Sequence, residues 1–291
     1  MRLWVLVPAE PLTDDRAYLI GFLKAVFDDI EVSFVDRRAT CAPQSERRPD
    51  LILNLVGGQS RSMLDDIDAI AARFGIPVSP VSAAAATTDD KRTYIRNFSD
   101  VSPPTGIARS IEEVRSALSK FGEIVVKDPF GMRGKGVERL RSEADLHVAA
   151  GLLANTTNDV GELVVQPFLS GFARGDKRII VQRSPRDDFQ IIGQIFRRPA
   201  PSEWKSSLRS GARAIRTELT PAEARLALEI AARTGLDNAT LDIGEHDGQL
   251  FYIEHNQGYG GLVDFDLDRE ALGVRACGDF LVHLARNGRP S

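Results

Sequence analysis

Cysteine is scarce in this sequence, and so are long apolar runs. Cys41 and Cys277 are too few and too far apart for a disulfide framework or a zinc ribbon. No stretch reaches the roughly 18 uncharged apolar residues of a membrane span. The N-terminus also lacks the basic and then apolar order of a signal peptide. We therefore expect a cytoplasmic protein with no membrane partner.

An excess of positive charge is also missing. The formal net charge is −4 and the isoelectric point is near 5.7, whereas nucleic-acid-binding proteins normally carry a basic face or stripe. We expect no nucleic-acid partner. Basic residues do outnumber acidic ones between Arg197 and Arg216, a segment that contains Lys205 and Arg209. It is either a solvated loop or a segment that meets phosphate or carboxylate groups.

What the chain does have is a clear alternation of strand and helix patterns at its start. β-Branched runs predict strands, and apolar residues at helical spacing predict helices between them. The predicted elements are a strand at 3–7, a helix at 14–27, a strand at 31–35, a strand at 51–56 and a helix at 63–74. Such alternation predicts a parallel sheet covered by helices, here a Rossmann-like lobe at residues 1–85.

Strand patterns dominate the rest of the chain. Residues 86–170 combine helical segments with short strands and predict a small α+β unit. Residues 171–291 hold further strands, a helix at 221–234 and a hairpin at 239–256. The predicted fold class is therefore α/β in the first lobe and α+β beyond it.

The hairpin sequence LDIGEHDGQLFYIEHN carries a cluster of oxygen ligands. Residues i and i+2 of a strand share a face, so Glu254 and Asn256 project the same way and His255 projects oppositely. A three-residue turn at 246–248 places Asp242 on that face too, whereas a two-residue Asp-Gly turn does not. Hard cations such as Mg²⁺ prefer oxygen ligands. The segment is either a magnesium site or an exposed acidic hairpin face.

A glycine-rich loop follows a strand in the sequence VVKDPFGMRGKGV. Lys127 ends the strand, and Gly131, Gly134 and Gly136 allow successive backbone N–H groups to face an anion. The glycine order matches neither a P-loop nor a dinucleotide fingerprint. The loop either closes over a triphosphate or is only a turn.

Arginines mark two further strand ends. In VVQPFLSGFARGDKRIIV, Asp176 and Arg178 begin a strand and share a face, and Arg197 ends the strand that follows. The planar guanidinium offers paired donors to phosphate and keeps its charge. These residues either meet a phosphate group or form an exposed ion pair at the strand end.

A third candidate region is the sequence LNLVGGQS, which joins a strand to a helix. Asn54 and Gly57 end the strand, and the helix begins near Ser60. Ligands of open α/β sheets collect at the carboxyl ends of strands, and a helix N-terminus favours a carboxylate. The alternative is an ordinary β–α turn that needs glycine for its geometry.

In this order and spacing, the segments from about Thr88 to Gly261 resemble the ATP-grasp superfamily, most closely its bacterial glutathione synthetase and RimK-like branch. The resemblance is carried by TDDKRTYIRNF…PPT, VVKDPFGMRGKGV, VVQPFLSGFARGDKRIIV and LDIG…LFYIEHNQGYGG. It implies an ATP-grasp fold with a Rossmann-like pre-ATP-grasp lobe at 1–85, a lid and hinge subdomain at 86–170, and a large subdomain at 171–291. It also implies a homo-oligomer, either a dimer or a tetramer.

The resemblance further implies a role for each candidate residue. The residues that would bind ATP are Lys91, Lys127, Gly131, Gly134, Gly136, Gln166, Phe168 and Asp176. Two Mg²⁺ ions, for which Mn²⁺ can substitute, would be held by Asp242, Glu254 and Asn256. The catalytic residues would be Arg178 and Arg197. The residues that would meet the substrates are Lys205, Arg209, Gly258, Tyr259 and Gly260, together with Asn54, Gly57 and Ser60 from the strand-to-helix argument above.

The implied activity is an ATP-dependent ligation of a carboxylate to an amine. An acyl phosphate would form first, and an amide, ADP and phosphate would be the products, from small amino-acid or peptide-like substrates. Residues 257–261 read QGYGG where glutathione synthetases carry a Thr-Ser-Pro-Thr-Gly type of loop, so the substrates stay open. One alternative is ring closure within one molecule, as in cycloserine synthetases. Another is a non-catalytic nucleotide-binding regulatory module.

Overall fold

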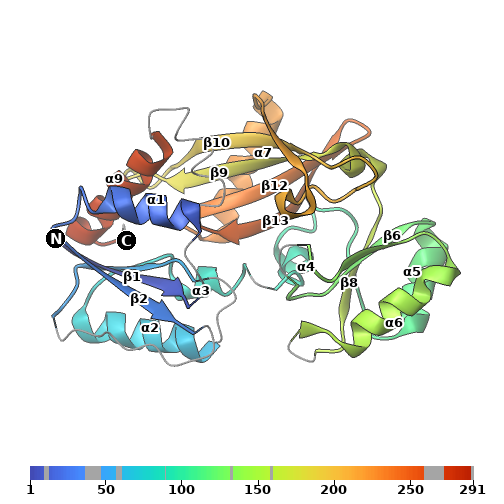
Figure 1. Cartoon of the computed structure of the whole chain (residues 1–291), viewed down its shortest axis with the longest axis horizontal. Helices are drawn as coiled ribbons and strands as arrows, with labels where there is room; N and C mark the ends of the chain where they lie inside the picture. The colour runs from blue at the N-terminus through green and yellow to red at the C-terminus, as the bar shows by residue number, and fades with distance from the viewer. Residues whose placement is uncertain are drawn as a thin grey trace.

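The computed structural model describes residues 1–9, 13–36, 47–56, 61–88, 90–131, 134–157, 160–258 and 272–289. Strands in this part of the chain form three sheets, each with helices packed against it (Figure 1). No helix of the described ranges is long and apolar enough to cross a membrane.

The N-terminal sheet is parallel, in the order β2-β1-β3-β4, as the sequence predicts. Both of its faces are buried: Trp4 packs with α2, and Leu3 with α1 and the C-terminal helix. Burial on both faces explains why β1 reads as a continuous apolar run. The elements of this lobe are β1 (Arg2–Pro8), α1 (Asp14–Leu23), β2 (Asp29–Val35), β3 (Leu51–Asn54), α2 (Arg61–Phe74) and β4 (Val78–Ser79).

Two short helices lead from this lobe to a second sheet, whose order is β5-β8-β6-β7. All its strand pairs are antiparallel, and α5 and α6 cover one face through a core that includes Val114, Leu118 and Ala149. The elements are α3 (Ser82–Ala85), α4 (Thr93–Asn97), β5 (Gly106–Ala108), α5 (Ile111–Phe121), β6 (Ile124–Lys127), β7 (Val137–Leu140), η1 (Glu143–Asp145), α6 (Leu146–Ala154) and β8 (Leu163–Pro167).

The third sheet is antiparallel, in the order β11-β10-β9-β12-β13. Helix α7 covers one face, where Ile230 packs with Ile179 and Leu241. On the other face, Ile180 and Ile195 join the core of α1 and α9. The elements are η3 (Ser170–Arg174), β9 (Asp176–Arg183), β10 (Phe189–Arg198), η4 (Leu208–Ser210), β11 (Arg213–Arg216), α7 (Pro221–Thr234), β12 (Asn238–His246), β13 (Gln249–Gln257) and α9 (Leu272–Asn287).

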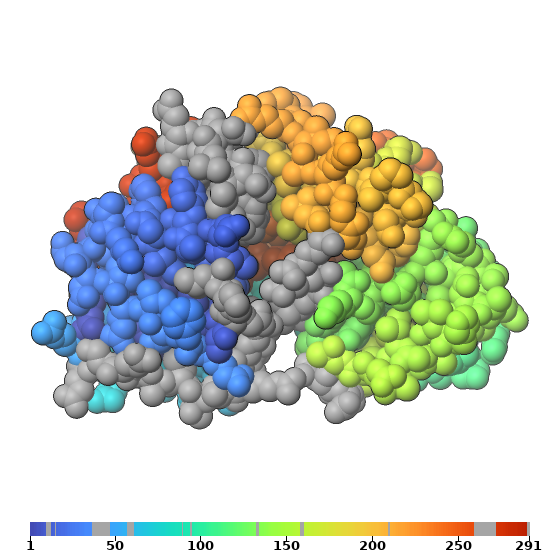
Figure 2. Space-filling view, in the orientation of Figure 1, coloured from blue at the N-terminus to red at the C-terminus, as the bar shows by residue number. Residues whose placement is uncertain are grey.

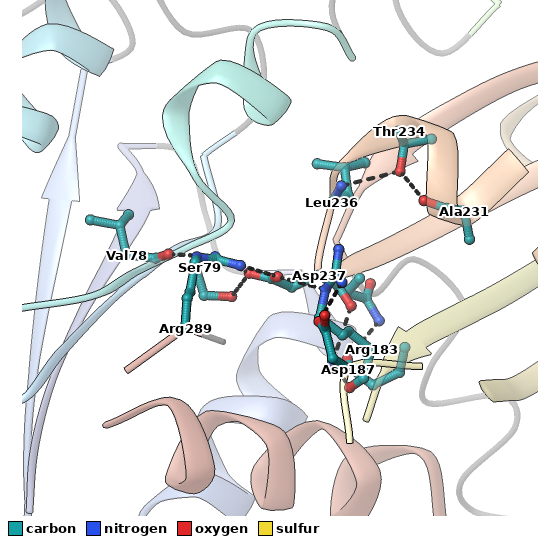
Figure 3. A network of polar contacts seen from close by, with 11 residues as sticks. Val78, Ser79, Arg183, Asp187, Ala231, Thr234, Leu236, Asp237 and Arg289 are labelled. Carbon is teal, nitrogen blue, oxygen red and sulfur yellow. Dashed lines mark hydrogen bonds and ion pairs between the residues drawn. The ribbon is translucent and has the colours of Figure 1, made fainter. Parts of the chain in front are cut away.

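The buried carboxylate of Asp237 contacts three segments that are far apart in the sequence (Figure 3). Asp237, which is 2% exposed, accepts hydrogen bonds from Ser79 Oγ at 2.8 Å and from both Nη atoms of Arg289 at 2.7 and 2.6 Å. The Arg183 guanidinium lies 3.3 Å from the same carboxylate, and Arg289 also donates to the Val78 carbonyl. Asp237 therefore joins β4, β9 and the end of the chain.

Asp237→Ala is expected to lower the free energy of unfolding by about 3 kcal/mol, because removing one partner of a buried ion pair leaves the other charges uncompensated. Ser79→Ala, which removes only one neutral donor, is expected to cost about 1 kcal/mol. Urea or thermal unfolding of the two variants measures the difference. Equal losses for both variants would show that Asp237 does not hold the junction through its charge.

Candidate active site

The hairpin of β12 and β13 places three predicted metal ligands on one face, but not through the predicted turn. The three-residue turn is wrong: His246 pairs directly with Gln249, and the two residues between them both have positive φ. This is the two-residue turn favoured by Asp-Gly. A bulge beyond Ile243 then shifts the register by one residue, so that Asp242 lies opposite Glu254.

Three further charged side chains, from the adjacent strands β9 and β10, meet beside this pair. Arg178 lies directly across from Asp242 and donates to both of its oxygens at 2.9 Å. Arg197 lies across from Asp176 and donates to both of its oxygens at 2.7 Å. Arg197 Nη2 is also 2.8 Å from Asp242 Oδ2, so Arg197 joins the two carboxylates. The structure thus brings both predicted catalytic arginines to the predicted metal strand.

Burial and ion pairing act on the two carboxylates with different net results. Asp242 is 1% exposed, and burial would raise its pKa, but the guanidinium groups of Arg178 and Arg197 outweigh this and lower the pKa to about 2. Burial dominates at Asp176 and raises its pKa to about 6, against the opposing effect of Arg197. Both carboxylates are therefore ionised at neutral pH, and Asp176 is the first of the two to take up a proton as the pH falls.

Two lysines approach the same region, Lys127 from the second sheet and Lys91 from the turn before α4. Lys127 ends β6 and is 9% exposed. Burial lowers its pKa to about 8; Glu254 opposes this shift and Lys91 adds to it. The Lys91 ammonium donates to the Gly131 carbonyl, and its backbone N–H donates to Pro129 at 2.9 Å. Lys127 is thus close enough to Glu254 and to Lys91 for their charges to act on its pKa.

Asp128, which the sequence reasoning did not single out, fixes the base of the glycine loop. Its carboxylate accepts from the Thr157 hydroxyl at 2.6 Å and from the N–H groups of Thr157 and Phe130 at 2.9 Å. A Cβ on Gly136 would come within 2.7 Å of Asp128, and Gly136 has a φ of +67°. Glycine is required there for this close approach. The Asp-Pro pair after the strand was the available signal of a turn.

The predicted adenine-binding residues have partners within the small sheet and the segment after β10. Gln166 donates to Thr105 Oγ1 at 2.7 Å. The Cζ atom of Arg139 lies over the Phe168 ring, 3.5 Å from the ring centroid. The rings of Phe168 and Trp204 pack edge to face, with 5.6 Å between their centroids. Trp204 was not predicted.

The basic segment after β10 contacts the second sheet, called the small sheet here, and the loop that joins two of its strands. Lys205 is 3.5 Å from Glu138 of β7, and Gly134 lies near Ser207. In Figure 2 this part of the chain, in orange, adjoins the green small sheet. The sequence left open whether this segment is a solvated loop. For Lys205 the structure shows an ion pair with strand β7 of the second sheet; the Arg209 side chain lies outside the described residues.

The predicted substrate region is described only in part. Asn54 is buried and accepts from the Val56 N–H at 3.1 Å, so its side chain shapes its own turn. Gln257 donates to the carbonyls of Asn54 at 3.3 Å and Val56 at 2.5 Å, which brings the ends of β3 and β13 together. The Gly258 carbonyl accepts from Thr240 at 2.9 Å. The predictions for Gly57, Ser60, Tyr259 and Gly260 lie outside the described residues.

The donor set at the hairpin suits a hard cation. Asp242 and Glu254 supply carboxylate oxygens from facing positions, and Asn256 supplies an amide oxygen two residues further along β13. Within the described ranges no cluster of three or more His, Cys, Asp or Glu side chains could hold a metal ion, so the amide is needed to complete the set. Because Arg178 and Arg197 occupy the oxygens of Asp242, a cation there would have to compete with them.

A pocket of about 510 Å³ opens at the same end of the third sheet but mainly on its α7 side. Its lining includes Lys177 and Glu223, whose side chains are paired at 2.7 Å, and Arg174, which is 3.8 Å from Glu245. Of the predicted site residues it includes only Asp176. Apart from Asp176, the pocket is therefore lined by residues other than the predicted lysines, arginines and oxygen ligands.

Solved structures with the same arrangement of sheets define the class of fold. The RimK domain ATP-grasp protein from Sphaerobacter thermophilus matches with a TM-score of 0.69 at 20% identity, covering 97% of this chain and 100% of its own. D-alanyl-alanine synthetase A from Vibrio cholerae matches with 0.70 at 15% identity, covering 99% and 98%. D-cycloserine synthetase DcsG matches with 0.69 at 17% identity, covering 97% and 100%. The fold is an ATP-grasp fold, as the sequence predicted.

Sequence comparison then places the chain within that class. The model of the prokaryotic glutathione synthetase ATP-grasp domain matches residues 91–245, more than half of the chain, and the chain belongs to this family. Glutathione synthetase of Mesorhizobium japonicum is 35% identical over 150 residues, which are 50% of this chain and 43% of that protein. The protein of the same name from Parasynechococcus marenigrum is 30% identical over 162 residues, 56% and 50% respectively. The chain therefore matches about half the length of these relatives.

Proposed function

We propose that this protein is an ATP-dependent carboxylate–amine ligase that forms an amide on a small amino-acid or peptide-like substrate and releases ADP and phosphate. The observation that carries the proposal is the convergence of Lys127 with Glu254, and of Arg178 and Arg197 with Asp242, from two different sheets. Cations and oxygen ligands gathered in this way suit the transfer of a phosphoryl group, in which the protein mainly positions and neutralises charge.

In this proposal each charged side chain has a distinct task. Lys91 and Lys127 bind phosphate oxygens of ATP, and Arg178 and Arg197 neutralise the charge that develops as the substrate carboxylate attacks the γ-phosphorus. The bond between the γ-phosphorus and ADP breaks. The amine then attacks the acyl carbon of the acyl phosphate, phosphate leaves, and the nitrogen gives up a proton as the amide forms. Mg²⁺ held by Asp242, Glu254 and Asn256 would supply further charge neutralisation between the phosphates. Gln166 and Phe168 would border the adenine, and the loop of Gly131, Gly134 and Gly136 would cover the phosphates.

The proposal extends to the organisation of the chain. We infer a pre-ATP-grasp domain at 1–85, a lid and hinge subdomain at 86–170 and a large subdomain at 171–291; each range contains one of the three sheets. By resemblance to the family we also infer two magnesium ions, a homo-oligomer and a cytoplasmic location. The carboxylate substrate would lie between the ends of β3 and β13, which Gln257 joins.

The direct test is to incubate the protein with Mg-ATP and pools of carboxylates and amino acids, and to follow phosphate release pool by pool. We expect release above background with at least one pool. With hydroxylamine in place of the amine, the acyl phosphate is expected to be trapped as a hydroxamate. Glu254→Gln protein, purified in the same way, controls for contaminating ATPases.

The stoichiometry of the active pool separates the alternatives. One amide and one phosphate formed for each carboxylate and each amine consumed supports ligation. Consumption of a single amino-acid-like substrate with no second one would show ring closure instead. Binding of ATP without phosphate or hydroxamate formation in any pool would contradict the ligase and favour a non-catalytic nucleotide-binding module.

A further inference from the structure

The first residue of β9 holds the guanidinium of Arg197 in a two-pronged contact. Asp176 Oδ1 accepts from Arg197 Nε and Oδ2 accepts from Nη2, both at 2.7 Å. The two residues are 8% and 5% exposed, and they lie directly opposite each other in the β9–β10 ladder. Paired hydrogen bonds of this kind fix the plane and direction of the guanidinium as well as its position.

The backbone next to Asp176 is built for this close approach. Gly175 has a φ of +132°, and a Cβ at this position would come within 2.4 Å of the Phe196 ring and 2.5 Å of the Arg197 carbonyl. Only glycine allows the chain to pass so near β10. The contact between Asp176 and Arg197 therefore depends on a specific local backbone, which an incidental ion pair on the surface would not need.

The direction set by Asp176 points Arg197 at the proposed metal strand. Nη2 of Arg197, the nitrogen that donates to Asp176 Oδ2, is also 2.8 Å from Asp242 Oδ2. Arg178, on the adjacent strand β9 directly opposite Asp242, makes its own paired contact with Asp242 at 2.9 Å. Without Asp176, Arg197 would keep Asp242 as its one ion-pair partner among the described residues, and its long side chain would be free to turn.

These contacts argue against the role that the resemblance implied for Asp176. Both carboxylate oxygens already accept a charge-assisted hydrogen bond from Arg197. A contact with the ribose hydroxyls of ATP would have to be made by the same, almost fully buried oxygens. The geometry favours an action of Asp176 through Arg197 over an action on the nucleotide.

We propose that Asp176 is a positioning residue, which fixes the Arg197 guanidinium beside Asp242 so that Arg197 can neutralise the transferring phosphoryl group. The proposal rests on the proposed function for the consequence in turnover, but the positioning itself is a property of the nucleotide-free protein. It predicts a loss in kcat with nucleotide affinity retained. A ribose contact predicts the reverse.

Asp176→Asn is the variant of choice, because it keeps the size of the side chain and removes the charge and one of the two acceptors. Its kcat is expected to fall by about 10-fold or more, as when an electrostatic stabiliser is misplaced. The KM and Kd for ATP are expected to stay within about twofold, a change of less than one hydrogen bond to a charged group. The matched control is Asp187→Asn, at an exposed carboxylate paired with Arg183 in the turn between the same two strands.

Comparison of ATP with 2′-deoxyATP separates the two roles of Asp176. Positioning predicts the same fold loss in kcat with both nucleotides. A ribose contact predicts a loss in affinity for ATP that largely disappears with 2′-deoxyATP, and this result would overturn the proposal. In the double variant with Arg197→Lys, the two losses in kcat are expected to be far from additive, since Asp176 acts through Arg197.

A measurement without turnover keeps the proposal separate from the proposed function. In the NMR spectrum of the nucleotide-free protein, we expect a slowly exchanging guanidinium signal that disappears in Arg197→Lys. The same signal is expected to be lost in Asp176→Asn and kept in Asp187→Asn. If it persists in Asp176→Asn, the positioning role is overturned; if it is lost while no substrate pool supports turnover, the positioning stands and the ligase assignment fails.

Discussion

Glu254→Gln is expected to lower turnover by about 10²-fold or more, the scale of losing one ligand of a catalytic metal. Glu254 is the residue of the oxygen-ligand set that lies directly opposite Asp242 and also faces Lys127. Gln keeps the length of the side chain but removes the negative charge that a cation needs. Steady-state phosphate release with the active substrate pool at saturating Mg²⁺ measures the effect.

The matched control is Glu245→Gln, at an exposed carboxylate on the same hairpin whose only ion pair among the described residues is a 3.8 Å contact with Arg174. Its turnover is expected to be near that of the wild type. Asn256→Ala is expected to behave like Glu254→Gln. Any of the proposed ligand variants that keeps more than about half of the wild-type rate would remove that residue from the metal site.

Asp242 requires a different expectation for stability. From the sequence, the two carboxylates would be expected to repel each other, so that their removal leaves the melting temperature unchanged or raises it. The structure instead pairs Asp242 with Arg178 and Arg197. Asp242→Ala would leave the buried guanidinium of Arg197 and the partly buried one of Arg178 without this partner, so we expect a loss of about 3–5 kcal/mol in the free energy of unfolding. Turnover of this variant is therefore interpretable only beside its melting curve.

Lys127→Met is expected to weaken ATP binding by about 10- to 100-fold, the equivalent of one hydrogen bond to a charged group. The fold is expected to persist, because methionine fills the space of the buried stem and removes an ammonium that burial disfavours. Calorimetric titration with a non-hydrolysable ATP analogue measures the affinity. The control is Lys120→Met, at an exposed position of helix α5. Tight binding by Lys127→Met would refute the phosphate contact.

The pH dependence of the same residue gives an independent check. Because the pKa of Lys127 is lowered to about 8, its ammonium loses its proton near that pH, and ATP affinity is expected to fall as the pH rises through 8. Lys127→Arg stays protonated, so its affinity is expected to remain level over the same range. A fall of equal size in both proteins would assign the pH effect to another group.

The free energy of unfolding of the protein without nucleotide is expected to change with pH in the opposite direction from ATP affinity. Between about pH 8 and the ordinary lysine value of 10.5, the unfolded chain binds more protons at Lys127 than the folded chain does. The contribution of this residue to stability therefore rises with pH across that window. In Lys127→Met this rise is expected to disappear, which unfolding curves at pH 7, 9 and 10.5 would show.

Much of the fold could be read from local patterns, because hydrophobic periodicity and turn residues act over short distances. The continuous apolar run at the start of the chain predicted β1, and α5 begins and ends where its helical spacing does. Two short strands, β5 and β11, were missed. Each has only three or four residues. Strand β5 forms because it pairs with β8, and β11 because it pairs with β10, and neither has a hydrophobic pattern that predicts a strand. The apolar spacing at residues 91–98 also predicts a helix, and helix α4 covers only Thr93–Asn97 of that range.

For the candidate site, the sequence by itself determined which residue types are present and which of them share a strand face. The pairing of Glu254 with Asn256 and of Asp176 with Arg178 follows from the two-residue period of a strand. The tertiary structure decided which faces meet. The strand order β10-β9-β12-β13 sets Arg197 beside Asp176 and Arg178 beside Asp242, and a bulge brings Asp242 opposite Glu254 after a two-residue turn that would otherwise have separated them. Register and strand order depend on contacts between distant segments, and for that reason no local pattern contains them.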